Sequence, residues 1–133
     1  MHIVKLIAIG SVVALASCQF GTRGSELPAA QRPGGAPATL EVSSGRYFGE
    51  LIAVQDDGVV ISGGKIMFAP FTAIKIFSLD MMGRDYRVGR GELPNAEKLA
   101  RLRAVSHFPQ GLTPDIRRRL LAFLGQTEIL SVQ

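Results

Sequence analysis

The residues with intrinsic reactivity are few in this chain, which has 133 residues, one cysteine and two histidines. His107 follows Ser106, but neighbours in sequence rarely form a nucleophile and base pair, and the next residues, Phe-Pro-Gln-Gly, are typical of a tight turn. The spacings Gly-x-Ser-x-Gly and His-Glu-x-x-His are absent from the sequence. We therefore predict that the protein is not an enzyme and has no catalytic residue. A small hydrolase that depends on His107 is kept as an alternative hypothesis.

The carboxylates of the sequence do not predict a metal site. Asp56 and Asp57 are adjacent, whereas calcium takes about six to eight oxygen ligands. With Gly58 they are instead typical of a type I or I′ turn between two strands. Glu50 and Asp80 are far apart in the sequence, which gives no reason to place them together. We predict no metal and no cofactor.

Arginine is the residue type that does predict a binding site. The formal net charge is +4, and residues 84–119 carry nine Lys and Arg against four Asp and Glu. The loop with Arg84, Arg87 and Arg90 presents guanidinium groups, which suit phosphate and carboxylate. We predict that this loop binds an anion, which would be a lipid head group, an acidic envelope polymer or an acidic partner.

The only cysteine, Cys18, follows a pattern that is typical of export. Lys5 and the amino terminus precede an apolar run, Leu6–Ala16, which is shorter than the roughly 20 residues needed to cross a bilayer. A positive start, a short apolar stretch and small residues after it indicate a secretory signal. With no second thiol, the exported chain has no internal disulfide. The alternative is that Cys18 is a small buried residue at the end of an ordinary helix.

Residues Leu15–Cys18, Leu-Ala-Ser-Cys, resemble the lipobox of bacterial lipoproteins. This resemblance implies that the Cys18 thiol receives diacylglycerol, that residues 1–17 are removed as a signal peptide, and that the new amino group is often acylated. Two or more acyl chains anchor a protein stably, so the implied partner of Cys18 is membrane lipid. In that family an Asp after the cysteine favours the inner membrane, so Gln19 favours the periplasmic face of the outer membrane.

Residues 18–38 are expected to be the lipidated cysteine and a disordered tether. The stretch is rich in Gly, Pro and Ala without an apolar period, so it cannot bury enough apolar surface to offset its ordering entropy. Residues 39–133 are long enough for one small domain. This domain is expected to consist of a β meander over 39–79, the basic loop over 80–94, and a helical pair with a last strand over 95–133.

The first part of the domain predicts a meander of about five strands. Runs rich in Val, Ile, Phe and Tyr alternate with Gly-bearing gaps of hairpin length. Five short strands leave open edges, which small proteins usually remove by curling the sheet into a barrel. The expected strands are TLEV from 39, YFGELIAV from 47, VVIS from 59, KIMFA from 65 and AIKIFSL from 73.

Residues 44–61, SGRYFGELIAVQDDGVVI, resemble the front of Sm-like and SH3-like small barrels. In those folds a glycine lets the long second strand bend and an acidic turn follows, which assigns the bend to Gly49 and the turn to Asp56–Gly58. The resemblance is taken for the fold of residues 39–79 alone. Sm-like proteins bind RNA in the cytoplasm, and an exported chain meets little RNA, so we predict no nucleic-acid partner.

The second part of the domain changes to helical periodicity. Leu99, Leu102 and Val105 form an apolar stripe after the start signals Pro94 and Asn95. We therefore expect a helix of about three turns over residues 95–105.

A second helix is expected to follow Thr113, the predicted N-cap, with Pro114 at its first position and Gly125 past its end. Its arginine run, Arg117–Arg119, is expected to form a solvated face opposite Ile116 and Leu120, and anion binding by this run is the alternative. The run TEILSV from 127 is expected to return as an edge strand. The predicted class is α+β, with a small β meander or barrel followed by two helices and a final edge strand.

These patterns predict a binding or scaffold module exported to the cell envelope. Our first hypothesis is that the domain docks another envelope protein through a strand edge or a helical face. The alternative is that it binds anionic lipid or polymer through Arg84, Arg87 and Arg90. The oligomeric state is left open.

Overall fold

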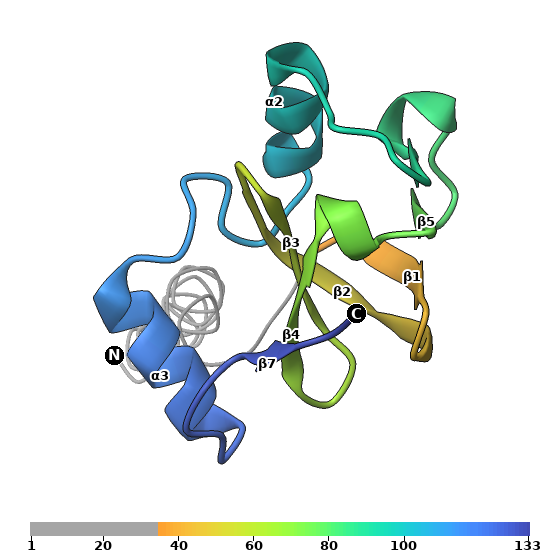
Figure 1. Cartoon of the computed structure of the whole chain (residues 1–133). Coiled ribbons are helices and arrows are strands. Elements are labelled where there is room, and N and C mark those ends of the chain that lie inside the picture. The colour runs from red at the N-terminus through yellow and green to blue at the C-terminus, as the bar shows by residue number, and fades with distance from the viewer. Residues whose placement is uncertain (1–34) are drawn as a thin grey trace, which may run out of the picture.

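The structure is a computed structural model that describes residues 35–133 (Figure 1). The predicted signal peptide, the lipidation of Cys18 and the tether as far as residue 34 lie outside the described residues. No helix within residues 35–133 is long and apolar enough to cross a membrane.

The described chain folds into one mixed sheet and two α-helices. The sheet has seven strands in the order β6-β5-β1-β2-β3-β4-β7, and all neighbours are antiparallel except β4 and β7. The elements are β1 (Pro37–Val42), β2 (Gly45–Gln55), β3 (Gly58–Ser62), β4 (Ile66–Pro70), the 3-10 turn η1 (Phe71–Ala73), β5 (Ile76–Leu79), the 3-10 turn η2 (Arg84–Tyr86), β6 (Val88–Gly89), α2 (Ala96–Ala104), α3 (Pro114–Phe123) and β7 (Leu130–Ser131).

The α+β class and the five central strands are confirmed, but the strand count and the closed barrel are wrong. The fifth strand returns to pair with the first, and two further strands, β6 and β7, extend the two edges of an open sheet. β6 is only the pair Val88–Gly89 inside the basic loop, which is too short to give a strand pattern. β1 begins at Pro37, two residues before the expected domain start at Thr39.

Strand β2 bends where it changes partner. It pairs with β1 over Gly45–Glu50 and with β3 over Glu50–Gln55. Gly49 lies at this change, as the sequence predicted, and a Cβ there would lie 2.2 Å from the carbonyl oxygen of Ser62. Only glycine therefore allows the two strands to approach so closely. The turn predicted at Asp56–Asp57 is also present, between β2 and β3.

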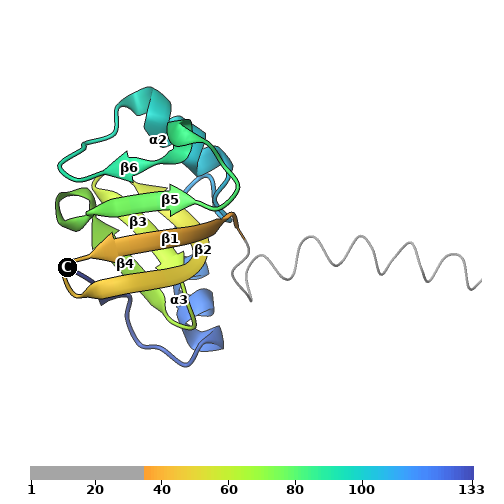
Figure 2. The same cartoon turned by 90° about the vertical axis from the view of Figure 1, so that its right-hand side faces the viewer.

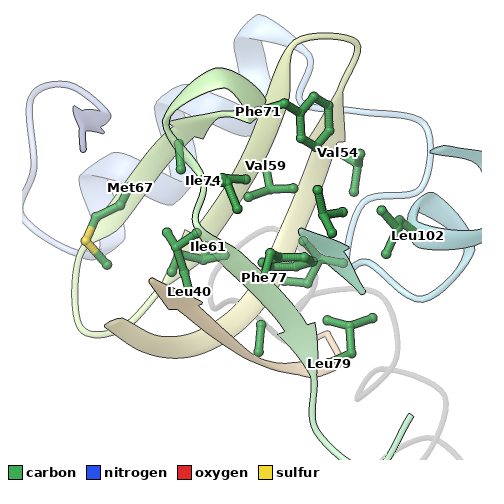
Figure 3. Close-up of a cluster of buried hydrophobic side chains, with 14 of the residues drawn as sticks. Leu40, Val54, Val59, Ile61, Met67, Phe71, Ile74, Phe77, Leu79 and Leu102 are labelled. Atoms are coloured by element: carbon green, nitrogen blue, oxygen red, sulfur yellow. The ribbon is translucent and has the colours of Figure 1, made fainter. Parts of the chain in front are cut away.

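The inner face of the curved sheet encloses the main hydrophobic core (Figure 3). Side chains from β1 to β5 meet there, and the fully buried Leu102 of α2 packs against them. Phe77 on β5 and Phe71 on η1 are the largest fully buried side chains of this cluster. Because α2 contributes Leu102 to the core of the sheet, it is fixed against the sheet rather than appended to it.

A second cluster covers the outer face of β2 to β4. Ile52, Val60 and Ile66 pack there against Leu120 and Leu121 of α3. These strands are therefore buried on both faces, whereas no helix covers β5, β1 and the first half of β2 in Figure 2.

The segment between the helices is attached to a bulge in β2. The register shifts between Leu51 and Ala53, which removes carbonyl groups from the regular ladder. The amide groups of His107 and Phe108 donate to the carbonyl oxygens of Leu51 and Ile52 at 3.0 and 2.9 Å. This pairing positions α3 over the outer face of the sheet.

Both helices begin as the sequence predicts. The side chain of Asn95 accepts from the amide of Lys98, and that of Thr113 accepts from the amide of Ile116. Gly125 has a φ of +69°, the left-handed conformation expected just past a helix end. The final edge strand is also confirmed as β7, which pairs in parallel with β4.

Candidate anion-binding surfaces

The three arginines of the predicted anion site do not converge on one place. Arg84 and Arg87 line a single open depression of about 470 Å³ beside β5. Arg90 lines a different depression together with Lys75. The depression of Arg84 and Arg87 extends along β5 from Ile76 to Leu79, whereas that of Arg90 includes Ile74 and Lys75, which precede β5.

Within residues 35–133, none of these three arginines forms an ion pair with a carboxylate. All three are exposed. The carboxylate that shares the depression of Arg84 and Arg87 is Asp80, which accepts a hydrogen bond from Thr39 Oγ1 at 3.3 Å. Arg84 and Arg87 therefore keep their donors available for an anion.

Two methionines beside these arginines were missed by the sequence analysis. Met81 is fully exposed and has a φ of +63°, and Met82 is exposed and lines the same depression as Arg84. Met81 is the only described residue other than glycine with a positive φ, a conformation that costs an L-residue roughly 1–2 kcal/mol. The signal in the sequence is the apolar pair between Asp80 and Gly83, where a polar turn is the norm.

The loop of the arginines is attached to α2. Glu92 accepts from the amide of Gly89 at 3.2 Å and from Lys98 Nζ at 2.5 Å. These hydrogen bonds, chiefly that of Lys98, lower the pKa of Glu92 below its ordinary value despite some desolvation. Arg101 Nη1 also donates to the carbonyl oxygen of Asp85 at 3.4 Å. The backbone that carries Arg84 and Arg87 is thus held in place.

The arginine run on α3 has a different environment. Arg118 and Arg119 both pair with Asp115, one turn earlier on the same helix, while Arg117 forms no ion pair within the described chain. The expected solvated face is thus present. Along it, however, lies an open groove of about 470 Å³ lined by Leu112, Pro114, Arg117, Arg118, Leu121, Ala122, Gln126 and Thr127.

The far end of this groove is fixed to the sheet by Gln126. Its Oε1 accepts from the amide of Ile66 at 2.7 Å, and its Nε2 donates to the carbonyl oxygen of Ile66 at 3.3 Å. Ile66 is fully buried, so Gln126 satisfies two backbone groups that water does not reach.

The remaining reactive side chains have structural partners. Ser106 Oγ donates to the carbonyl oxygen of Arg103 at 2.7 Å, so this hydroxyl satisfies a backbone group in the last turn of α2. The ring of His107 contacts that of Phe108 edge-on, with centroids 4.5 Å apart. Asp56 accepts from Arg103 Nη2 at 2.6 Å, which joins the turn to α2.

Glu50 and Asp80, which the sequence did not place together, both flank Pro37. Glu50 is opposite Pro37 in the β1–β2 ladder, and the amide of Asp80 donates to the carbonyl oxygen of Pro37 at 2.8 Å. Residues 35–133 contain no group of three or more His, Cys, Asp or Glu side chains that would hold a metal ion.

No protein-family model matches this chain, no curated protein matches it, and no solved structure matches it.

Proposed function

We propose that the protein is a lipoprotein of the bacterial cell envelope, anchored through acylated Cys18, whose domain is a non-catalytic module that docks another envelope protein. The export pattern and the lipobox resemblance support the anchor. The groove beside α3 is the observation that supports docking, because it combines apolar lining with a guanidinium group that has no carboxylate partner in the described chain. Gln19 supports the periplasmic face of the outer membrane.

The chemistry of the groove suits an acidic segment that also carries apolar side chains. Leu121 and Ala122 offer apolar contact at the groove, and Phe123, next along the helix, is about half exposed. Arg117 would pair with a carboxylate of the partner, with a bidentate geometry that lysine lacks. Because Gln126 fixes the end of the groove to β4, this surface would lose little conformational entropy when a partner binds.

The sheet edges are less suited to docking than the groove. β6 and β7 cover the two edges of the central strands, and each has only two residues. Such short edges offer few hydrogen bonds to an added strand. Of the two docking modes that the sequence left open, we therefore propose the helical face.

We also propose that the five central strands are a small open barrel of the SH3-like or Sm-like kind. The bend of β2 at Gly49 and the acidic turn at Asp56–Asp57 support this assignment. The assignment concerns the fold alone and carries no RNA-binding function.

Site-specific photo-cross-linking in the native cells tests the docking. A photoreactive residue at Ala122, in the groove, is expected to capture one envelope protein through a segment rich in Asp or Glu, which mass spectrometry of the adduct identifies. Arg117→Glu is expected to remove that adduct. A photoreactive residue at Arg46, on the uncovered part of the sheet, is the matched control and is expected to give no such adduct. An adduct at Ala122 that persists with Arg117→Glu, or no adduct at all, would contradict docking through the groove.

A further inference from the structure

The turn that follows β5 presents apolar and cationic side chains together. We call residues 80–87 the methionine tip. Met81 is fully exposed and Met82 is exposed beside Arg84 and Arg87, which have no carboxylate ion pair in the described chain. Exposed methionines followed by arginines are a composition suited to the boundary between lipid head groups and acyl chains.

Met81 is fully exposed, and its left-handed backbone conformation is unfavourable for an L-residue. A positive φ in a residue other than glycine is uncommon. Strain of this kind persists where the surrounding structure imposes it, and it is found at functional positions. Here the neighbouring hydrogen bond from Asp80 N to Pro37 O fixes the start of the turn.

The methionine tip lies where the chain joins the sheet. Ala38, near the start of β1, pairs with Leu79 at the end of β5, and Asp80 is bonded to Pro37. The first described residues, Gly35–Pro37, are therefore at the same end of the sheet as the tip (Figure 2). An anchor at Cys18 would keep this end of the domain within reach of the membrane.

We propose that the methionine tip inserts into an anionic lipid surface, with Met81 and Met82 among the upper acyl chains and Arg84 and Arg87 against the phosphates. This inference rests on the proposed anchor at Cys18. It assigns an orientation to the anchored domain, with the tip toward the lipid.

Two carboxylates of the tip act against an anionic surface. Asp80 accepts a hydrogen bond from Thr39, and Asp85 is exposed in η2. Neither forms an ion pair with Arg84 or Arg87. Residues 80–87 therefore carry two positive and two negative formal charges, so their net charge gives no attraction and the exposed methionines are required for insertion.

Tryptophan fluorescence measures the insertion directly, because the natural chain contains no tryptophan. Met81→Trp is introduced into the full-length protein, which is purified from its membranes and reconstituted into vesicles of phosphatidylethanolamine and phosphatidylglycerol. The expected result is a blue-shifted emission that lipids brominated near the head of the acyl chain quench and that aqueous iodide does not. Phe123→Trp, an exposed aromatic position on α3, is the matched control and is expected to show the reverse.

Met82→Trp repeats the measurement where the first variant fails to fold. Quenching by iodide and not by brominated lipid at both positions 81 and 82 would overturn the inference. The intact mass of the same sample reports whether Cys18 is acylated. An acylated protein with a water-exposed tip refutes the insertion and leaves the anchor intact. An unacylated protein refutes the anchor, and quenching of the tip on vesicles added to it would still support the insertion.

Discussion

The basic loop that contains the methionine tip and helix α3 each carry three arginines, yet only α3 pairs any of them with a carboxylate, and its Arg117 stays without one in the described chain. Asp115 pairs with both Arg118 and Arg119, whereas Arg84, Arg87 and Arg90 have no carboxylate partner in the described chain. The cause is geometric: a helix brings residues three and four apart onto one face. The 3-10 turn and short strand of the loop do not create such pairs. The number of arginines in a segment therefore says less about anion binding than the backbone that carries them.

The largest expected effect concerns the arginines of the loop. In the Met81→Trp background, changing Arg84 and Arg87 to Gln is expected to weaken insertion into anionic vesicles about 30-fold, since each arginine near an anionic surface is worth roughly 1 kcal/mol. Arg118→Gln with Arg119→Gln is the matched control and is expected to leave the quenching unchanged. Equal losses in the two double variants would show that only total charge matters.

Loss of the Gln126 side chain is expected to destabilise the α3 side of the molecule. Gln126→Ala leaves the buried amide and carbonyl of Ile66 without partners, which costs about 1–3 kcal/mol of unfolding free energy. Thermal unfolding of the full-length protein in detergent measures this cost. Thr127→Ala, an exposed neighbour, is expected to change stability far less. A Gln126→Ala protein as stable as the natural one would show that Gln126 does not hold the groove.

Replacing Met81 is expected to stabilise the fold while weakening its contact with the membrane. Met81→Gly relieves the left-handed strain but adds flexibility to the unfolded chain, so a net stabilisation of up to about 1 kcal/mol is expected. Lipid quenching of an indole placed at Met82 is expected to fall in the same variant. A protein that is destabilised by Met81→Gly would show that the Met81 side chain serves the fold.

Glu92 is expected to give a small, pH-dependent contribution to the attachment of the loop. Its pKa is lowered in the folded state, so the stabilisation is present above its unfolded pKa and is lost as pH falls through the folded pKa. Because the Glu92 side chain is more than a third exposed, Glu92→Gln is expected to cost less than about 1 kcal/mol near neutral pH. The difference in unfolding free energy between the natural protein and Glu92→Gln should vanish in acid. A difference that grows in acid would contradict a lowered pKa of Glu92 in the folded state.

The smallest expected effect tests why the two arginine segments differ. Asp115→Asn removes the partner of Arg118 and Arg119 and is expected to cost about 0.5 kcal/mol of stability, because these pairs are exposed. It is expected to make vesicle binding of the α3 face measurable by quenching in the Phe123→Trp background. If quenching stays absent, pairing by Asp115 is not what distinguishes α3 from the loop.

Local patterns predicted most of the fold. The strands follow from alternation, and the starts of the helices follow from the signals at Asn95 and Thr113. The bend at Gly49 follows from the resemblance of residues 44–61 to small barrels. β6 and the open sheet were not predictable, because Val88–Gly89 has no pattern and edge pairing depends on contacts between distant segments.

The candidate sites were less predictable than the fold. The residue types predicted Arg84 and Arg87 as candidates, but their placement in a different depression from Arg90 depends on how the loop folds along β5. Met81 was missed because its exposure depends on a backbone conformation that glycine usually adopts. The groove beside α3 depends on Gln126 reaching β4, sixty residues earlier in the chain.

The intact mass of the protein extracted in detergent from its native membranes tests the central claim most directly. The account predicts a mass equal to the chain from Cys18 to Gln133 plus two or three acyl chains. An unmodified mass that includes residues 1–17 would contradict the anchor, and the insertion of the methionine tip would then depend on the vesicle quenching alone.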